Sequence, residues 1–502
     1  MMIREPETSC QNTDQNLAYL LRITAQNYPN KVAIIDGTRS ITYSELWMMV
    51  QSLTKPLMEA GIREGACIGI RLPNSIDYIG LTYALWCMSA VVVPIAMELK
   101  LPEINRLCTT MSLQAVISFS PSEGARPVIH PQAGGAYYIA MLSSPKDHRI
   151  TSAAAFIRFS SGTTGRCKGV LLTHAGIYDR IQAANKGLHI TADDTIVWVL
   201  SMAHHFAATI VLFCSQGATI VLVNNPLANS IIEAVNRNKA TILYAVPFHY
   251  ALLSADRTAR MLASLRAAFS TTTALPESLA AKFLLRYNIA IAQVYGIIEL
   301  GLVCINTSHA ADKLPSVGQP LPDYRIKIVS DDNDKSTSKL GTICFTGPGF
   351  FEAYCAPFTL AQDVLEDGWF NTGDIGYCDD DGFLYICGRC NDIINVAGEK
   401  VFPFEVETVL NELDCVKEAC VYRETHPLFG EIAVADVVLA IPLPLNEARA
   451  MIHEHCTKNL AMYKIPAVIN FVPEISKTPV TGKIIHGRHL QDMDHAQPNP
   501  ER

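Results

Sequence analysis

The most informative part of this 502-residue sequence is the segment Phe159-Ser160-Ser161-Gly162-Thr163-Thr164-Gly165-Arg166-Cys167-Lys168-Gly169. Its glycines allow the backbone to turn tightly and bring N–H groups close to a phosphate. Its hydroxyls and its lysine add hydrogen-bond donors and positive charge. Strand-like apolar residues flank the segment on both sides, so we interpret it as a phosphate-binding loop between two strands. An ordinary turn rich in Gly, Ser and Thr is the structural alternative.

The P-loop of kinases and GTPases is the first competing interpretation of this segment. That motif requires Gly-Lys followed by Ser or Thr. Here Cys167 precedes Lys168, and Gly169 follows it. The segment therefore does not match a P-loop, which argues against a kinase or a GTPase.

Apolar segments on the N-terminal side of the loop alternate between helical and strand-like patterns. Ser44 is expected to cap the second helix, and the Pro-, Gly- and Ser-rich residues 120–150 are expected to form loop. Strands that alternate with helices indicate an α/β fold with a largely parallel sheet. We expect helices near 17–28, 45–60, 78–90 and 101–111, and strands near 32–35, 41–43, 66–72, 91–93 and 115–117.

A second alternating series covers residues 151–305, and the pattern changes after Pro315. Short strands are expected at 324–329 and 341–345, joined by an exposed polar loop. A small α+β unit is expected to follow a boundary near Arg389. Length and pattern together predict two domains, 1–388 and 389–502.

Composition excludes several classes of function. The formal charge of -8 gives no basic field to recruit nucleic acid. No apolar stretch reaches the ~20 residues needed to span a bilayer, and no signal sequence is evident, so we expect a cytoplasmic protein without a transmembrane segment. Most of the 15 cysteines are expected to be buried thiols, and the Cys387-to-Cys390 spacing lacks the second pair that a zinc site needs.

Six segments, in order, resemble the adenylate-forming superfamily of acyl-CoA synthetases, adenylation domains and firefly luciferases. The phosphate-binding loop is the first, with Cys167 in place of a common proline. The other five are Tyr295-Gly296-Ile297-Ile298-Glu299, Gly368-Trp369-Phe370-Asn371-Thr372-Gly373-Asp374, Gly388-Arg389-Cys390-Asn391-Asp392, Val396-Ala397-Gly398-Glu399-Lys400-Val401-Phe402-Pro403-Phe404-Glu405-Val406-Glu407, and Lys477-Thr478-Pro479-Val480-Thr481-Gly482-Lys483-Ile484.

The resemblance covers nearly the whole chain and is specifically acyl-CoA-synthetase-like. It implies a large N-terminal ATP- and carboxylate-binding domain of parallel-rich sheets, helices and a β-barrel-like part. A small mobile α+β domain would follow, with a hinge near 389–392. The implied reaction is ATP-dependent adenylation of a carboxylic acid, followed by thioester formation. The implied cofactors are ATP, Mg²⁺ and CoA or the phosphopantetheine of a carrier protein.

The resemblance also implies roles for individual residues. Lys483 would bridge the carboxylate and the α-phosphate, and Glu299 would hold Mg²⁺, which prefers oxygen ligands. Asp374 would accept hydrogen bonds from the ribose hydroxyls, and Arg389 would contact ribose or phosphate. The remaining nucleotide-binding residues would be Ser160, Ser161, Gly162, Thr163, Thr164, Gly165, Lys168, Tyr295 and Gly296.

Three positions concern the second half-reaction and a departure from the family pattern. Asn391 falls at the hinge, and Gly398 is expected to face the incoming thiol, where the lack of a side chain leaves room. Ile298 replaces the family's threonine, whose hydroxyl helps to bind the AMP phosphate. Losing one hydrogen bond to a charged partner is worth ~1–3 kcal/mol, so ATP or adenylate binding is expected to be weaker.

The acid pocket is expected to contain His204, His205, Phe206, Phe248, Thr271 and Thr272. Adjacent side chains on a strand point to opposite faces, which argues against His204 and His205 binding one metal ion. In the family, the branch that activates α-amino acids usually has an Asp here, which binds the substrate ammonium. No Asp lies between Leu200 and Thr209, so the resemblance argues against an α-amino acid. The two threonines add bulk where glycine is common, so a short, medium-chain or aryl carboxylate is expected.

Other outcomes stay open at the level of sequence. The enzyme could load the acyl group onto a carrier protein, since the first half-reaction is the same. It could also be a catalytically weak adenylate-binding homologue, as Ile298 suggests, or carry out a luciferase-like oxidation on the same fold. A homodimer is possible, and the sequence does not give the oligomeric state.

Overall fold

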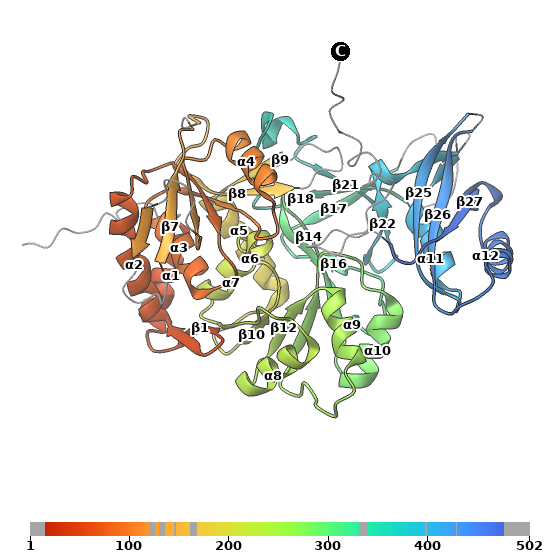
Figure 1. Cartoon of the computed structure of the whole chain (residues 1–502), viewed down its shortest axis with the longest axis horizontal. Helices are drawn as coiled ribbons and strands as arrows, with labels where there is room; N and C mark the ends of the chain where they lie inside the picture. Colours follow the sequence, from red (N-terminus) through yellow and green to blue (C-terminus); the bar gives the residue numbers. More distant parts are fainter. Residues whose placement is uncertain are drawn as a thin grey trace, which may run out of the picture. The chain divides into compact units, whose positions relative to one another are not determined.

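The computed structural model describes residues 16–120, 126–129, 136–144, 147–160, 168–330, 340–396, 399–427 and 429–475. The chain forms two compact units (Figure 1). The first contains the described residues of Met1–Ile326, Phe345–Phe370 and Asp380–Leu384, and the second contains those of Lys327–Cys344, Asn371–Asp379 and Tyr385–Arg502. Because this grouping assigns part of residues 1–388 to the second unit, a domain boundary at 388/389 stays a proposal.

The first unit is built on two nine-stranded sheets, which confirms the expected α/β class. The first sheet has the order β16-β15-β14-β13-β12-β10-β11-β1-β2. Its strands are β1 (Val32–Asp36), β2 (Arg39–Thr42), β10 (Thr195–Trp198), β11 (Thr219–Leu222), β12 (Ile242–Ala245), β13 (Ala267–Ser270), β14 (Ile291–Ile297), β15 (Gly301–Ile305) and β16 (Gln319–Pro320). The six central strands, β14-β13-β12-β10-β11-β1, are parallel to one another. The edge strands β2, β15 and β16 pair antiparallel.

The second sheet has the order β20-β19-β9-β8-β4-β3-β5-β7-β6. Its strands are β3 (Cys67–Arg71), β4 (Val91–Pro94), β5 (Ala115–Ser118), β6 (Arg126–Ile129), β7 (Ala136–Met141), β8 (Ala154–Ser160), β9 (Lys168–Thr173), β19 (Ala353–Cys355) and β20 (Phe358–Leu360). β8 and β9 are antiparallel, and Ser160 pairs with Lys168. The two ends of the expected phosphate-binding loop therefore lie side by side.

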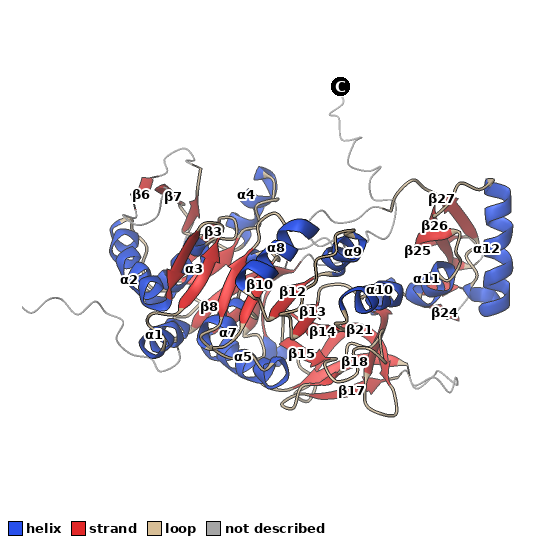
Figure 2. Ribbon diagram, turned by 90° about the horizontal axis from the view of Figure 1, so that it is seen from below, coloured by secondary structure: helices blue, strands red, loops and turns tan. Residues whose placement is uncertain are grey.

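Helices pack between and around these two sheets (Figure 2). α3 packs on β4 of one sheet and on β1 of the other, and α5 packs on β15, β8 and β9. Both helices therefore bury apolar faces against two sheets. The helices are α1 (Leu17–Asn27), α2 (Tyr43–Glu59), α3 (Ile76–Cys87), α4 (Leu101–Thr110), α5 (His174–Leu188), α6 (Met202–His205), α7 (Ile210–Ser215), α8 (Ala228–Asn238), α9 (Pro247–Ala255) and α10 (Glu277–Tyr287).

Two local expectations were wrong. Thr42, not Ser44, caps α2, because the Thr42 side chain accepts the Glu45 N–H while the Glu45 carboxylate accepts the Thr42 N–H. Residues 120–150 are not all loop, since β6 and β7 form a hairpin that extends the second sheet beyond β5. Tyr137 and Ile139 alternate inward on β7 and are 1% exposed, a period-two pattern that the Gly and Pro content obscured.

The second unit contains two sheets. One is four-stranded, in the order β17-β18-β21-β22, where the β-barrel-like part was expected; the other has the order β24-β23-β26-β25, with β27 paired to β26. The expected loop at 331–339 lies outside the described residues. The elements are β17 (Arg325–Val329), β18 (Gly341–Thr346), β21 (Phe370–Cys378), β22 (Leu384–Arg389), β23 (Ile394–Val396), β24 (Glu399–Val401), β25 (Val416–His426), β26 (Gly430–Leu439), β27 (Val468–Phe471), α11 (Pro403–Asn411) and α12 (Leu445–Asn459).

No helix in the described ranges is long and apolar enough to cross a membrane. The longest, α2, carries charged residues and has the exposed and buried faces of a surface helix.

A buried carboxylate fixes the start of β10, the strand that leads into the expected acid pocket. Asp194 is 3% exposed and accepts hydrogen bonds from Arg266, at 2.8 Å from both Nε and Nη2, and from the Thr241 hydroxyl at 2.7 Å. The Thr191 N–H donates to it at 2.9 Å. Burial raises the pKa of Asp194, but these hydrogen bonds outweigh burial and leave the pKa below its usual value.

We predict that Asp194→Asn lowers the free energy of unfolding by about 2 kcal/mol at pH 7, because hydrogen bonds to a charged group are lost. Partial solvation of Arg266 keeps the effect to this size. Because the pKa of Asp194 is lower in the folded state than in the unfolded chain, where it is about 3.9, its ionisation stabilises the fold above about pH 3.9. This stabilisation is lost as the pH falls through the pKa of the folded state. The difference from wild type, measured by urea unfolding, therefore shrinks below about pH 4.

The matched control is Asp193→Asn, because Asp193 is the exposed neighbour. If both variants lost the same free energy of unfolding at every pH, the role of the Asp194 hydrogen bonds would be contradicted.

Candidate active site

The expected acid-pocket residues and Glu299 follow strands that end at one edge of the first sheet. Strands β10, β12, β13 and β14 are parallel, so their carboxyl ends meet at the same edge. His204–Phe206 follow β10, Phe248 follows β12, and Thr271 and Thr272 follow β13. Glu299 follows β14. This edge is where open α/β sheets bind ligands.

A buried arginine holds the turn that carries Glu299. Arg180 on α5 is 5% exposed and donates to the carbonyl oxygens of Ile298, at 2.7 Å, and of Glu299. Its Nε donates to the carbonyl of Gly349. Burial lowers the pKa of Arg180 to about 10, against the charge of Glu299, which raises it. The three hydrogen bonds satisfy the guanidinium and fix the β14–β15 turn against α5.

The turn itself requires glycine. A Cβ on Gly296 would lie 2.6 Å from the carbonyl oxygen of Gly301, and Gly301 has φ +86°. Tyr295 before it is 9% exposed, and its ring lies 6.1 Å from that of Phe345. The Tyr-Gly pair thus fixes the end of β14 just before Glu299.

The Glu299 carboxylate is oriented from the second sheet. The Tyr354 hydroxyl on β19 donates to Glu299 Oε1 at 3.0 Å. Lys168 at the start of β9 is exposed, and its Nζ lies 4.8 Å from the centre of the Tyr354 ring. The structure therefore brings together Glu299 and Lys168, two residues that sequence reasoning placed on Mg²⁺ and on phosphates.

The arrangement around Glu299 fits a magnesium ion shared with phosphates. No group of three or more His, Cys, Asp or Glu residues within the described ranges could hold a metal ion alone. Mg²⁺ commonly binds through one or two carboxylates plus substrate phosphates, and one hydrogen-bonded carboxylate supplies the protein's part. Cys387 and Cys390 likewise belong to no such group in the part of the chain that the structure describes.

Several predicted residues fall outside the described residues. Ser161, Gly162, Thr163, Thr164 and Gly165 do so, as do Gly398 and Lys483. The backbone of Ser160 lies on β8, and that of Asn391 lies on the short turn Cys390–Asp392. The assignments of these residues stay predictions.

The second unit holds the predicted ribose-binding pair. Arg389 Nε lies 2.9 Å from Asp374 Oδ1; the Asp374 side chain is 6% exposed and that of Arg389 is 48% exposed. Asp374 is positioned through its N–H, which donates to the Thr372 hydroxyl at 3.0 Å. A buried carboxylate that holds an accessible guanidinium offers both an acceptor for hydroxyls and a donor for phosphate.

The two histidines of the acid pocket lie on helix α6, not on a strand. The strand-alternation argument about their directions was therefore wrong. Burial, then the charges of Arg158 and His204, hold the pKa of His205 well below its usual value, so its imidazole is neutral at pH 7. The neutral ring lies 6.0 Å from the ring of Trp198.

Aromatic rings line up across the strands next to His205. Trp198, Tyr244 and Phe269 are register partners on β10, β12 and β13. Their ring centres are separated by 5.6 Å and 5.8 Å. Thr272, with φ +81°, has a buried hydroxyl without a hydrogen-bond partner in the described part. Phe248, in contrast, is 64% exposed on the first turn of α9.

Family models match most of the chain. The model described as "AMP-binding enzyme" covers residues 21–355, and the one described as "AMP-binding enzyme C-terminal domain" covers residues 405–483. The chain belongs to the AMP-binding enzyme family. This confirms the resemblance to the adenylate-forming superfamily and its acyl-CoA synthetases.

Individual relatives of this AMP-binding enzyme match along most of their length. A long-chain-fatty-acid–CoA ligase of Mycobacterium tuberculosis is 29% identical, over 94% of this chain and 97% of the relative. A 2-succinylbenzoate–CoA ligase of Bacillus licheniformis is 27% identical, over 91% and 96%. A feruloyl-CoA synthase of Amycolatopsis is 28% identical, over 92% and 96%.

Solved structures confirm the fold. A fatty acyl CoA synthetase of Mycobacterium tuberculosis has a TM-score of 0.72 at 25% identity and covers 94% of this chain and 97% of its own. An o-succinylbenzoate CoA synthetase of Bacillus subtilis, in complex with its acyl-adenylate intermediate, has a TM-score of 0.79 at 24% identity and covers 95% and 98%.

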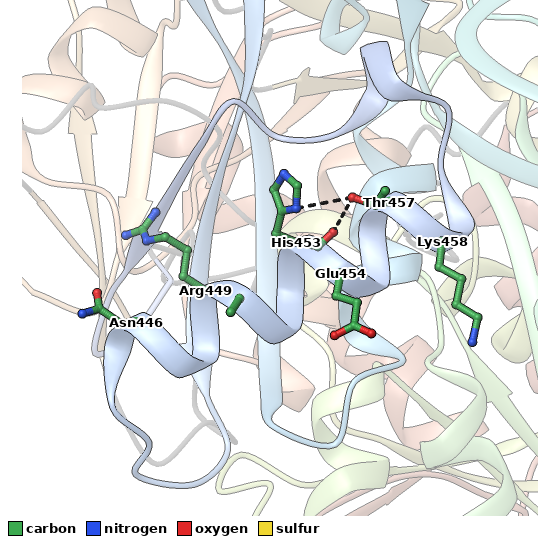
Figure 3. A pocket seen from close by; sticks show the side chains of 7 residues that line it. Asn446, Arg449, His453, Glu454, Thr457 and Lys458 are labelled. Carbon is green, nitrogen blue, oxygen red and sulfur yellow. Dashed lines mark hydrogen bonds between the residues drawn. The ribbon is translucent and has the colours of Figure 1, made fainter.

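A surface groove lies elsewhere, on helix α12 (Figure 3). The figure shows polar side chains along one helix, with His453 Nδ1 and the Thr457 hydroxyl 3.4 Å apart. Its lining residues include none of those predicted for catalysis. They are Asn446, Arg449, Ala450, His453, Glu454, Thr457 and Lys458.

Sequence reasoning missed Arg158, Arg180 and Tyr354. Arg158 could have been found as the charged residue of the apolar strand that precedes the phosphate-binding loop. Arg180 shares a helical face with Ile177 and Ala184, where a charge is unexpected. Tyr354 carries no such signal, because its role depends on a contact with Glu299 that is distant in sequence.

We predict that Tyr354→Phe raises the Mg²⁺ concentration required for half-maximal activity by about tenfold, because one hydrogen bond to a charged group is lost. The measurement is pyrophosphate release titrated with Mg²⁺ at fixed ATP. Tyr178→Phe, which changes an exposed tyrosine on α5, is the control. An unchanged Mg²⁺ requirement in Tyr354→Phe would remove Tyr354 from the orientation of Glu299.

Proposed function

We propose that this chain is an AMP-forming acid–thiol ligase, which adenylates a carboxylic acid with ATP and then transfers the acyl group to CoA. The observation that carries the proposal is the match to CoA ligases over 91–94% of the chain, in a fold that places Glu299 at the carboxyl edge of a parallel sheet. ATP, Mg²⁺ and CoA are the cofactors used by this class of enzyme.

The chemistry is governed by charge. A carboxylate oxygen must attack the α-phosphorus of ATP while pyrophosphate leaves, and the two reactants repel each other. Mg²⁺, when bound at Glu299, would supply neutralising charge at the phosphates. The chain's own part is to orient Glu299 through Tyr354 and Arg180, and to place Lys168 beside the phosphates.

In the second half-reaction, the thiol sulfur attacks the acyl carbonyl and AMP leaves. We propose that the C-terminal domain rotates about 389–392, so that Lys483 serves the first step and Gly398 lines the thiol path in the second. The match to the AMP-binding C-terminal domain model supports the placement of Lys483 in that domain. Asn391 would then be the hinge residue.

We propose an aryl or a short- to medium-chain acid as substrate. The rings of Trp198, Tyr244 and Phe269 are buried next to neutral His205, so the surroundings of the expected pocket are apolar and aromatic, which suits an aryl group. Feruloyl-CoA synthase and 2-succinylbenzoate–CoA ligase are among the relatives, and their names specify aryl acids. A long-chain-fatty-acid–CoA ligase is also among them, so chain length needs direct measurement.

The experiment is pyrophosphate release from ATP and Mg²⁺ with a panel of aryl and C2–C16 acids, with and without CoA. Release with one class of acid, accelerated by CoA and yielding a thioester, supports the proposal. Release without an effect of CoA favours a carrier-protein phosphopantetheine as the acceptor, the second candidate function. Absence of release with every acid, combined with ATP binding, favours a weak adenylate-binding homologue.

A cytoplasmic location and a homodimeric state are further proposals.

We predict that Lys483→Ala reduces adenylation at least a hundredfold and leaves the thermal unfolding temperature unchanged, because a charge that bridges carboxylate and phosphate in the transition state is worth about 3 kcal/mol. Pyrophosphate release measures the first effect. Lys458→Ala on α12 is the control, and equal activities of the two variants would remove Lys483 from the mechanism.

We predict that Ile298→Thr lowers the KM for ATP by roughly tenfold, because it restores a hydroxyl that can donate to the AMP phosphate. The Ile298 carbonyl already accepts from Arg180, so the backbone position is preserved. The KM for ATP in Ile297→Thr, the adjacent change, is the comparison. An unchanged KM in Ile298→Thr would mean that another group supplies this hydrogen bond.

A further inference from the structure

One charged side chain near the site has no role in the reaction as described so far. Arg158 lies on β8, two residues before Ser160. Because Phe156 is two residues before Arg158, both side chains lie on the same face of the strand. Phe156 stacks on Phe206 with ring centres 6.3 Å apart, and Phe206 directly follows His205. The face of β8 that carries Arg158 is therefore the face toward α6 and the acid pocket.

One nitrogen of the Arg158 guanidinium lacks a hydrogen-bond partner among the described residues. This nitrogen, Nε, is buried. Burial lowers the pKa of Arg158 to about 10, against the nearby charge of Glu299. The residue as a whole keeps partial exposure, so a small ligand can reach it. Arg180, in contrast, has its guanidinium occupied by three carbonyl oxygens.

The local charges leave a positive surplus. Arg158 and Arg180 interact electrostatically with each other and with the single carboxylate of Glu299. His205, whose pKa is lowered by burial and by the charge of Arg158, is neutral at pH 7. Two guanidinium charges thus face one carboxylate in a partly desolvated site. An uncompensated buried charge is costly, so the site is built to receive an anion.

The position of Arg158 selects between the anions of the proposed reaction. The phosphates have Lys168, the loop hydroxyls and Mg²⁺ as proposed partners. The acid has Lys483, which is proposed to bridge it to the α-phosphate, and the described residues assigned to its pocket include no lysine or arginine. Arg158 is close enough to interact electrostatically with Glu299 and with His205, and it shares a face of β8 with Phe156, whose ring stacks on that of Phe206. A guanidinium can bind a carboxylate through two parallel hydrogen bonds, so arginine is well suited to this anion.

We propose that Arg158 binds a carboxylate of the acid substrate, and this inference rests on the ligase function proposed above. The carboxylate is the reacting group or the second carboxylate of a diacid. In either case the guanidinium offsets the repulsion between the acid and ATP before the α-phosphorus is attacked.

The test compares wild type with Arg158→Gln and Arg158→Lys, using two matched pairs of acids: hexanoate with adipate, and benzoate with terephthalate. Calorimetric titration of each acid without ATP gives its Kd, and pyrophosphate release gives KM for acid and ATP separately. We expect Arg158→Gln to weaken acid binding roughly 10- to 100-fold, with KM for ATP unchanged. Arg158→Lys, which keeps the charge, should recover part of this loss.

The two sources of the carboxylate give different patterns. Equal weakening of monoacids and diacids identifies the reacting carboxylate, and selective weakening of diacids identifies a second carboxylate. Arg106→Gln, at an exposed arginine on α4, is the control for loss of a positive charge. Circular-dichroism melting verifies that the Arg158 variants fold.

Three results would overturn the inference. The first is an unchanged acid affinity in Arg158→Gln. The second is a rise in the KM for ATP in this variant that matches the rise in the KM for acid. The third is that none of the four acids binds to the wild-type protein. The proposed function fails separately, through absence of pyrophosphate release across the whole acid panel in wild type, while the titrations still decide the role of Arg158.

Discussion

The buried guanidinium of Arg180 holds in place the segments of the first unit that carry the proposed catalytic residues. Arg180 donates to carbonyls of Ile298, Glu299 and Gly349, so α5 holds both the turn after β14 and the segment that leads to β19. β19 carries Tyr354, which orients the Glu299 carboxylate. Leaving buried carbonyls and a buried charge unpaired is costly, so each element is fixed by the others. The position of the proposed magnesium ligand follows from this clamp.

The parallel strands add a second constraint, because they deliver several loops to one edge. His205, Thr272 and Glu299 come from three segments far apart in sequence, yet each follows the carboxyl end of a parallel strand. The edge therefore combines buried aromatic rings, a neutral imidazole and a carboxylate. We propose that it holds an acyl group beside phosphates, and that Lys168, Arg158 and a bound magnesium ion would offset their mutual repulsion.

Sequence patterns predicted the α/β class, most elements and the family, because apolar periodicity and short glycine-rich motifs are local signals. They failed where structure depends on distant partners. The β6–β7 hairpin is stabilised by pairing with β5, and its Gly and Pro content suggested loop. His204 and His205 lie on a four-residue helix too short to show a period. Arg180 and Tyr354 act through contacts more than 50 residues away, which no local pattern contains.

We conclude that this chain activates a carboxylic acid as its adenylate. Acid-dependent exchange of labelled pyrophosphate into ATP, in the absence of any thiol, measures this step, since only reversible adenylation returns the label to ATP. We expect exchange that requires both Mg²⁺ and a carboxylic acid. Exchange without an acid, or no exchange with any acid of the aryl and C2–C16 panel despite ATP binding, would contradict it.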